Sequence, residues 1–173
     1  MSWFRPSTPF RLATALAGSL LLLGLGGCQV RPLYATDSNA RAALSSIEFS
    51  DADDRVEQEV RNQLIFMTSG GAGEPAKPDY YVDLDVTTRN IGVLLELSSD
   101  TPRAGRIEVK AQYTLKKVAT GEVLRTGRRM SVALVDFPTQ EFAKIRATRD
   151  AENRAARELA ELIRADLASW LGR

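Results

Sequence analysis

Apolar and polar side chains alternate along most of the chain between residues 79 and 136, which is the period of a half-buried β-strand. The alternation is most regular in 106–117, where the odd-numbered residues from Ile107 to Leu115 are predicted to face a core. A tight connection leads to 123–136, so we expect an antiparallel hairpin. In its second strand, four even-numbered residues are predicted to face the core: Leu124, Met130, Val132 and Leu134.

The stretch 79–97 changes phase in its middle. Its even-numbered residues are apolar up to Val86, and its odd-numbered residues are apolar from Ile91 onward. A shift of one residue exchanges the two faces of a strand, so we expect a bulge or bend at 88–90. An unbroken strand of this length would exceed ~55 Å, which also favours a break.

Two other stretches have the spacing of amphipathic helices. The first is predicted to begin at the capping residue Ser50 and to end at Gly70, with one apolar stripe: Val56, Val60, Leu64 and Met67. The second follows Pro138, with Thr139 as its cap. At ~45 Å it is long enough to kink or to protrude from the fold. Its predicted buried side consists of Phe142, Ile145, Ala156, Leu159, Ile163, Leu167 and Trp170.

A short apolar segment from Leu44 to Phe49 adds a first strand. The order is therefore strand, helix, three strands and a long helix. A helix between the first two strands permits a parallel crossover, while tight turns require antiparallel neighbours. We expect an α+β two-layer sandwich, in which two helices pack on one face of a four-stranded mixed sheet. The other face carries alternating charges and must meet water or a partner.

The N-terminus has the composition of a secretory signal peptide. Arg5 and Arg11 precede an apolar run from Leu12 to Leu25, and small residues lead to Cys28, the only cysteine. The order resembles a bacterial lipobox, which implies diacylglyceryl attachment to Cys28 and cleavage before it. An ordinary signal peptide or a short membrane span with a chance cysteine is the alternative. The run is shorter than the ~20 residues of a spanning helix, which favours the lipoprotein.

This interpretation divides the chain into a signal peptide at 1–27, a lipid-anchored tether at 28–43 and one domain at 44–173. Removal of 27 of the 173 residues takes away two of the 23 basic residues and none of the 22 acids, leaving a net charge of −1. Such a balance provides no global field for nucleic acid, and any anion site must be a local patch.

Composition also limits catalysis. There is no histidine, and the only cysteine lies in the lipobox, so a cysteine nucleophile, a zinc site and a disulfide framework are not expected. Two carboxylates suffice for glycoside hydrolysis, and a carboxylate hydrolase would need an acid pair in a cleft. Because most acids are predicted on solvated faces, we expect no enzyme, no metal and no cofactor beyond the lipid on Cys28.

The chain resembles the lipopolysaccharide-assembly lipoprotein family, LptE, over nearly its whole mature length. The resemblance rests on the lipobox, on the order of the elements and on the C-terminal pattern from Phe142-Ala143 to Leu159-Ala160. Its most specific motif is Arg31-Pro32-Leu33-Tyr34, just after Cys28. Membership implies a non-catalytic outer-membrane lipoprotein, facing the periplasm. It would plug and help to assemble a large β-barrel translocon and bind lipopolysaccharide. Gln29, in place of aspartate, agrees with outer-membrane sorting.

Lipid A phosphates would need basic side chains, for which arginine provides a donor fork and lysine a point charge. The best pair is Arg106 and Lys110, which share a strand face. Their alternative role is in a solvated sheet face, paired with Asp83, Asp85 or Glu108. The candidate donors are Arg106, Lys110, Arg103, Arg89 and Arg128, with Arg129 beside them.

Two further alternatives remain open. Leu94 lies where both faces of its strand are apolar, so it either stays exposed near the turn or is turned into the core by the bulge. The chain could also be an envelope lipoprotein that serves as a structural or transport accessory subunit without a role in lipopolysaccharide assembly. Loss of surface lipopolysaccharide on depletion would distinguish the first function from the second.

Overall fold

The structure, a computed structural model, describes residues 39–96 and 101–172, which belong to one compact unit. The predictions for the signal peptide, Cys28, the tether up to residue 38 and the turn at 97–100 lie outside the described residues. In chain order the elements are α2 (Asn39–Leu44), β1 (Ile47–Phe49), α3 (Arg55–Ser69), β2 (Tyr80–Glu96), β3 (Thr101–Lys117), β4 (Val123–Asp136) and α4 (Glu141–Leu171).

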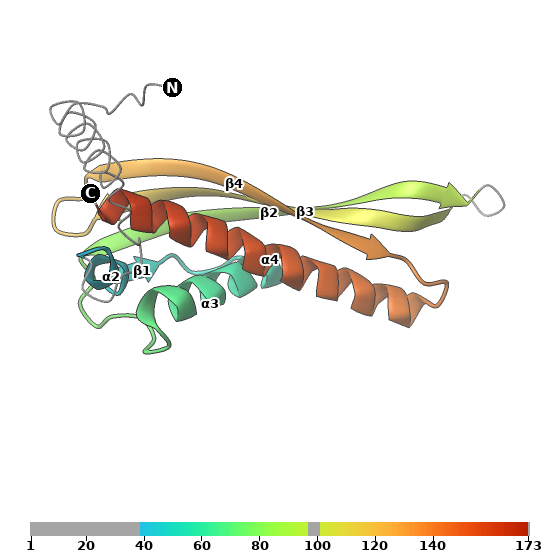
Figure 1. The fold of residues 1–173 in the computed structure, drawn as a ribbon, viewed down its shortest axis with the longest axis horizontal. Helices are drawn as coiled ribbons and strands as arrows, with labels where there is room; N and C mark the ends of the chain where they lie inside the picture. The colour runs from blue at the N-terminus through green and yellow to red at the C-terminus, as the bar shows by residue number, and fades with distance from the viewer. Residues whose placement is uncertain (1–38, 97–100, 173) are drawn as a thin grey trace, which may run out of the picture. The chain divides into compact units, whose positions relative to one another are not determined.

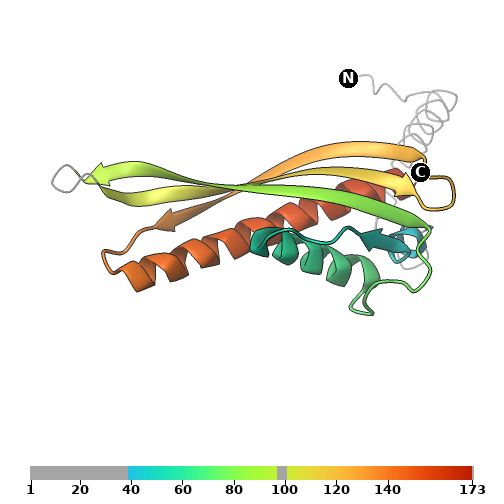
Figure 2. The same ribbon diagram turned by 180° about the vertical axis from the view of Figure 1, so that it is seen from behind.

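The four strands form one sheet in the order β1-β2-β3-β4. β1 pairs parallel to β2, and the other two pairs are antiparallel. Helices α3 and α4 cover one face of this sheet, as Figure 1 and the reverse view in Figure 2 show. The predicted α+β sandwich is confirmed. The short helix α2, which the sequence pattern did not predict, adds Ala40 and Leu44 to the core.

The core lies between the helices and the predicted inner face of β3. The odd-numbered residues of β3 from Ile107 to Leu115 are buried, as are Val82, Leu84 and Val86 on β2. Each large aliphatic side chain removed from water in this way contributes about 1.5–3 kcal/mol. The part of α4 above them is rich in buried alanines, which let the helix approach the strands closely: Ala151, Ala155, Ala156, Ala160 and Ala168.

The prediction for the inner face of β4 is wrong for Met130, Val132 and Leu134, whereas Leu124 packs against the core as predicted. Val109 is paired with Ser131 and Ile107 with Ala133, so the odd-numbered residues in this part of β4 face α4. The three even-numbered apolar residues therefore lie on the opposite face, where Met130 is 50% and Leu134 is 71% exposed. Close packing against an alanine-rich helix selects small side chains, and those are the residues that a hydrophobicity pattern ranks lowest.

The predicted break in β2 at 88–90 is also wrong. β2 is continuous and pairs with β3 residue by residue as far as Gly92, opposite Gly105. The register shifts come later, between Gly92 and Leu95. The long partner strand β3 supports the whole length of β2, and the irregularity falls where two glycines leave no cross-strand side chains to pack. The prediction for the side chain of Leu94 lies outside the described residues.

Both predicted helix caps are wrong. Helix α3 begins later than expected, and its cap is Asp54, whose carboxylate accepts a hydrogen bond from the N–H of Glu57 at 2.8 Å. Ser50 instead extends β1, because its N–H donates to the carbonyl of Val82. The cap of α4 is Gln140, whose side chain makes no capping hydrogen bond, and not Thr139.

The apolar stripes of the helices are confirmed only in part. Val56, Val60 and Leu64 of α3 are buried, as is the C-terminal half of the α4 stripe. At the start of α4, however, Phe142 is 71% and Ile145 45% exposed. In both ribbon views this end of α4 diverges from the β2–β3 hairpin, so its first turns lie away from those two strands.

Candidate functional site

The face of the sheet that the helices leave uncovered carries most of the predicted basic residues. We call it the open face and define it by the even-numbered residues of β3 together with their cross-strand partners. In one row Lys110 lies between Thr87 and Met130, and in the next Gln112 lies between Asp85 and Arg128. These side chains are held in place by long, uninterrupted strand pairing and not by a loop.

Arg106 and Lys110 do share this face, but an acid joins them. Glu108, between them on β3, contacts the Arg106 guanidinium at 3.0 Å and the Lys110 ammonium at 3.3 Å. Although it belongs to the open face, Glu108 is only 8% exposed. The positive charge of the predicted pair is therefore partly neutralised by the largely buried carboxylate of Glu108. Further along the face, Lys116 pairs with Asp83 at 2.8 Å, one of the predicted alternatives.

A hollow of about 390 Å³ opens next to Lys110 and brings a second predicted residue to it. Arg128 lies diagonally across from Lys110 on β4, a spacing of ~7–8 Å that both long side chains can bridge. The Arg128 guanidinium donates to the amide oxygen of Gln112 at 3.1 Å, which is a neutral partner. The hollow is lined by Asp85, Thr87, Lys110, Gln112, Arg128, Arg129 and Met130.

The other predicted donors lie elsewhere. Arg89 is the exposed cross-strand partner of Glu108, one row away from the hollow. Arg103 lies three residues from Arg106, at the register shift between β2 and β3, where the ladder passes from Ala104 to Pro102. The structure thus brings together Lys110 and Arg128, keeps Arg106 and Arg89 in the neighbouring rows, and does not place Arg103 at the hollow.

Arg129 has a structural role. Its backbone faces β3, and its guanidinium donates two hydrogen bonds to Asp166 of α4 at 2.6 and 2.7 Å. The same carboxylate accepts a hydrogen bond from the Tyr113 hydroxyl. The hydrogen bonds from Arg129 are the main reason that the pKa of Asp166 is lowered below its ordinary value of 3.8. Arg129 reaches the rim of the hollow with its charge already paired.

An apolar strip on β4 adjoins the basic residues. Met130, Val132 and Leu134 follow one another along the open face and are all exposed. The alternation pattern predicts these three residues in the core and therefore does not reveal the strip. Exposed apolar side chains that adjoin charged ones suit an amphiphilic ligand or a protein partner better than water alone.

The hollow offers little to catalysis. Its only acid is Asp85, so it lacks the acid pair that a carboxylate hydrolase needs. Within residues 39–96 and 101–172, no three potential ligand side chains gather as a metal site would require. In the same residues no helix has the length and apolar character needed to cross a bilayer.

Comparison with solved structures supports the fold. A Caulobacter crescentus CB15 protein assigned as a lipoprotein is 25% identical with a TM-score of 0.65, over 76% of this chain and 95% of that chain. A minor lipoprotein from Acinetobacter baumannii is 12% identical with a TM-score of 0.51, over 71% and 88% of the two chains, which shows a shared fold. No curated protein sequence matches the chain.

The family comparison covers most of the chain. Residues 42–167 match the model of the lipopolysaccharide-assembly family LptE, from the end of α2 through nearly all of α4. The match includes every strand of the sheet and both helices that cover it. This chain therefore belongs to the lipopolysaccharide-assembly family, LptE.

Proposed function

We propose that the chain is an outer-membrane lipoprotein that binds lipopolysaccharide on the open face of its sheet while it assists a β-barrel translocon. The observation that carries the proposal is the combination of Lys110 and Arg128 at one hollow with the exposed strip Met130, Val132 and Leu134 beside it. Family membership gives the ligand class, because lipopolysaccharide presents phosphates and acyl chains together.

The roles of the two halves of the site follow from their chemistry. The Arg128 guanidinium can bind a phosphate through two parallel hydrogen bonds, and Lys110 adds a point charge. Apolar acyl chains would lie against the strip. Each Å² of apolar surface removed from water in this way would contribute about 25 cal/mol to the binding free energy. The protein performs no chemistry on the ligand in this proposal, and it holds and positions it.

The anchor and the partner complete the proposal. A lipid on Cys28 would tether the domain to the outer membrane facing the periplasm, and the translocon barrel would hold it there. A diacylglyceryl group buries two acyl chains, enough for stable anchoring, and contacts with the barrel would hold the anchored domain at the translocon. Replacement of Cys28 by alanine should abolish acyl labelling while the barrel is still recovered with the chain.

The binding experiment compares two variants of equal net charge. Lys110→Gln/Arg128→Gln removes the charges at the hollow, whereas Lys116→Gln/Arg157→Gln removes one charge near the far end of the same face and one from α4. With purified protein and lipopolysaccharide at low salt, we expect binding to weaken about tenfold or more in the first variant only, since two charged contacts are lost. Equal binding by the wild type and the first variant would remove the hollow from the site.

The accessory-subunit alternative predicts a different result. A chain without a role in lipopolysaccharide assembly would still be recovered with envelope proteins, but its depletion would leave surface lipopolysaccharide unchanged.

A further inference from the structure

Strand β4 lies at the edge of the sheet, and the β3–β4 pairing shows which of its backbone N–H and C=O groups point away from the sheet. The N–H of Phe137 donates to the carbonyl of Arg103 at 2.7 Å, which sets the pattern of the β3–β4 pairing. Odd-numbered residues of β4 therefore direct their N–H and C=O groups at β3, and even-numbered residues direct theirs away from the sheet. The side chains of these even-numbered residues also lie on the open face.

Arginine side chains close the two ends of this edge. Arg125 donates to the carbonyl of Leu124 at 2.8 Å, and Arg154 reaches from α4 to the carbonyl of Leu134 at 3.0 Å. Between them, from Thr126 to Val132, the outward backbone groups have no partner among the described residues. Unpaired N–H and C=O groups in a row are a template for another strand.

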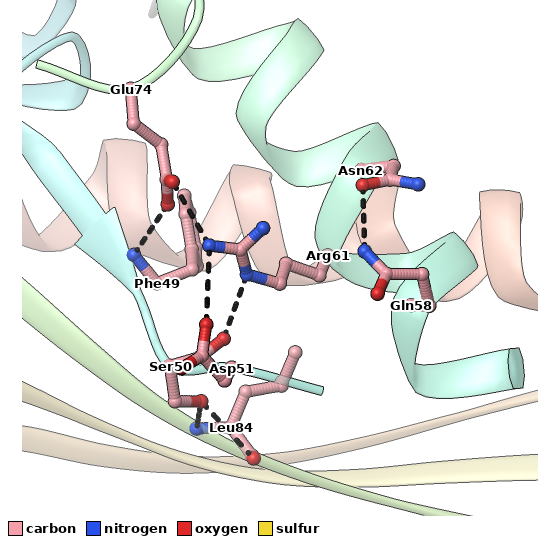
Figure 3. A network of polar contacts seen from close by, with 8 residues as sticks. All are labelled: Phe49, Ser50, Asp51, Gln58, Arg61, Asn62, Glu74 and Leu84. Carbon is pink, nitrogen blue, oxygen red and sulfur yellow. Dashed lines mark hydrogen bonds and ion pairs between the residues drawn. The ribbon is translucent and has the colours of Figure 1, made fainter. Parts of the chain in front are cut away.

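The opposite edge of the sheet, at strand β1, has outward backbone groups paired with side chains. β1 has only three residues, and the outward N–H of Phe49 donates to the Glu74 carboxylate at 3.2 Å. Arg61 fixes that carboxylate at 2.9 Å and donates to the carbonyl of Ser50 at 2.8 Å. Figure 3 shows this network covering the β1 edge. The fold thus protects one edge with a loop and leaves the middle of the longer edge available.

Charge decides which strand could pair there. β4 carries Arg125, Arg128 and Arg129 against one acid, Asp136. Arg129 is already paired with Asp166, but two copies of β4 would still bring Arg125 and Arg128 of each copy together, four arginines against two aspartates, so a second copy of this chain is disfavoured. A partner segment with apolar residues opposite Met130 and Val132 would match the apolar side chains of this edge. An acidic residue near Arg128 would match its charge.

We infer that β4 from Thr126 to Val132 pairs with an extended, acidic and apolar segment of a protein partner. The partner adds a fifth strand to the sheet, with main-chain hydrogen bonds for affinity and the open-face side chains for selection. The identity of that partner as the translocon barrel rests on the proposed function, whereas the pairing itself rests on the geometry of the edge.

A proline substitution tests the pairing. Val132→Pro removes an outward N–H and leaves the hydrogen bonds to β3 intact, whereas Val132→Ala shortens the same side chain and keeps the N–H. With the full lipidated chain from gently solubilised membranes, we expect recovery of the barrel to fall about tenfold for the proline variant and less than about twofold for the alanine variant. Equal recovery of every co-purified protein, the barrel included, for both variants would overturn the inference, whereas loss of a protein other than the barrel only in the proline variant would support the pairing and contradict the proposed partner.

Photo-cross-linking gives a second test that does not depend on the proline variant. A photoreactive amino acid replaces Arg128, Met130 or Val132 in turn, with Lys116 as the control position. Pairing predicts cross-links to one partner segment, with attachment sites spaced by about two residues. Cross-links only to lipopolysaccharide, only to a second copy or to scattered sites would overturn it. A correctly spaced segment in a protein other than the barrel would support the pairing and contradict the proposed partner.

Discussion

Arg129 of β4 and Asp166 of α4 form a two-point contact, with hydrogen bonds of 2.6 and 2.7 Å from the guanidinium to the carboxylate. Tyr113 of β3 donates to the same carboxylate, and its ring lies 5.8 Å from that of Trp170. The contact joins two strands to the last turns of the long helix. An arginine next to the predicted ligand site thus fixes the packing of the sheet on the helix.

Replacement of Asp166 by asparagine should lower the free energy of unfolding by about 1–3 kcal/mol at neutral pH, because charge-assisted hydrogen bonds are lost. The native pKa of Asp166 lies below its ordinary value of 3.8, so the carboxylate stabilises the fold fully above that pH. Its contribution is lost as the pH falls through the native pKa. Denaturation at several pH values should show the wild type and Asp166→Asn converging at acidic pH, with Glu161→Gln as the control. A difference that widens as the pH falls would contradict this assignment.

Gly127 should not tolerate a side chain. A Cβ added there would lie 2.5 Å from the ring of Tyr113, which Asp166 holds in place. We expect Gly127→Ala to destabilise the fold by about 1–3 kcal/mol, as overpacking does. The cost should shrink in a Tyr113→Leu background, measured as a double-mutant cycle by denaturation. If Gly127→Ala destabilises the fold equally in both backgrounds, the destabilisation comes from the backbone of β4 and not from a clash with the Tyr113 ring.

Glu108 should restrain anion binding on the open face. Replacement by glutamine releases Arg106 and Lys110 from their shared carboxylate, so lipopolysaccharide binding at low salt should strengthen up to about fivefold. The gain should decrease as salt is added. Asp83→Asn, which releases Lys116 outside the hollow, serves as the control and should have little effect. Weaker binding by Glu108→Gln would show that the carboxylate positions the two cations.

The apolar strip should serve binding and not stability. Leu134→Ser is expected to change the free energy of unfolding by less than about 0.5 kcal/mol, because the side chain is already exposed. Lipopolysaccharide binding should nevertheless weaken. Val135→Ser, which alters the buried neighbour, should destabilise the fold by more than about 1 kcal/mol. If Leu134→Ser destabilises the fold as much as Val135→Ser, the assignment of faces on β4 is wrong.

The sequence predicted the layers of this fold correctly, because alternation in β3 and the stripe in α3 reflect burial directly. It failed on β4, where Ser131 and Ala133 face the helix and the larger residues face outward. Hydrophobicity cannot reveal a face that is selected for small size. The same error hid the apolar strip, and therefore half of the candidate site.

The basic residues of the candidate site could be proposed from the sequence, but their ion-pair partners and their neighbours across the strands could not. Spacing alone placed Arg106 and Lys110 on one face. It did not show that Glu108 would join them or that Arg128 would approach Lys110 across the strands. Such relationships depend on the register between β3 and β4, which a single sequence does not encode locally.

The most direct test of the account is the amount of surface lipopolysaccharide in cells whose only copy of the chain is Lys110→Gln/Arg128→Gln. With protein levels matched to the wild type, we expect surface lipopolysaccharide to fall, whereas Lys116→Gln/Arg157→Gln restores the wild-type amount. Wild-type surface lipopolysaccharide in cells carrying the first variant would contradict a role for the open face in lipopolysaccharide assembly.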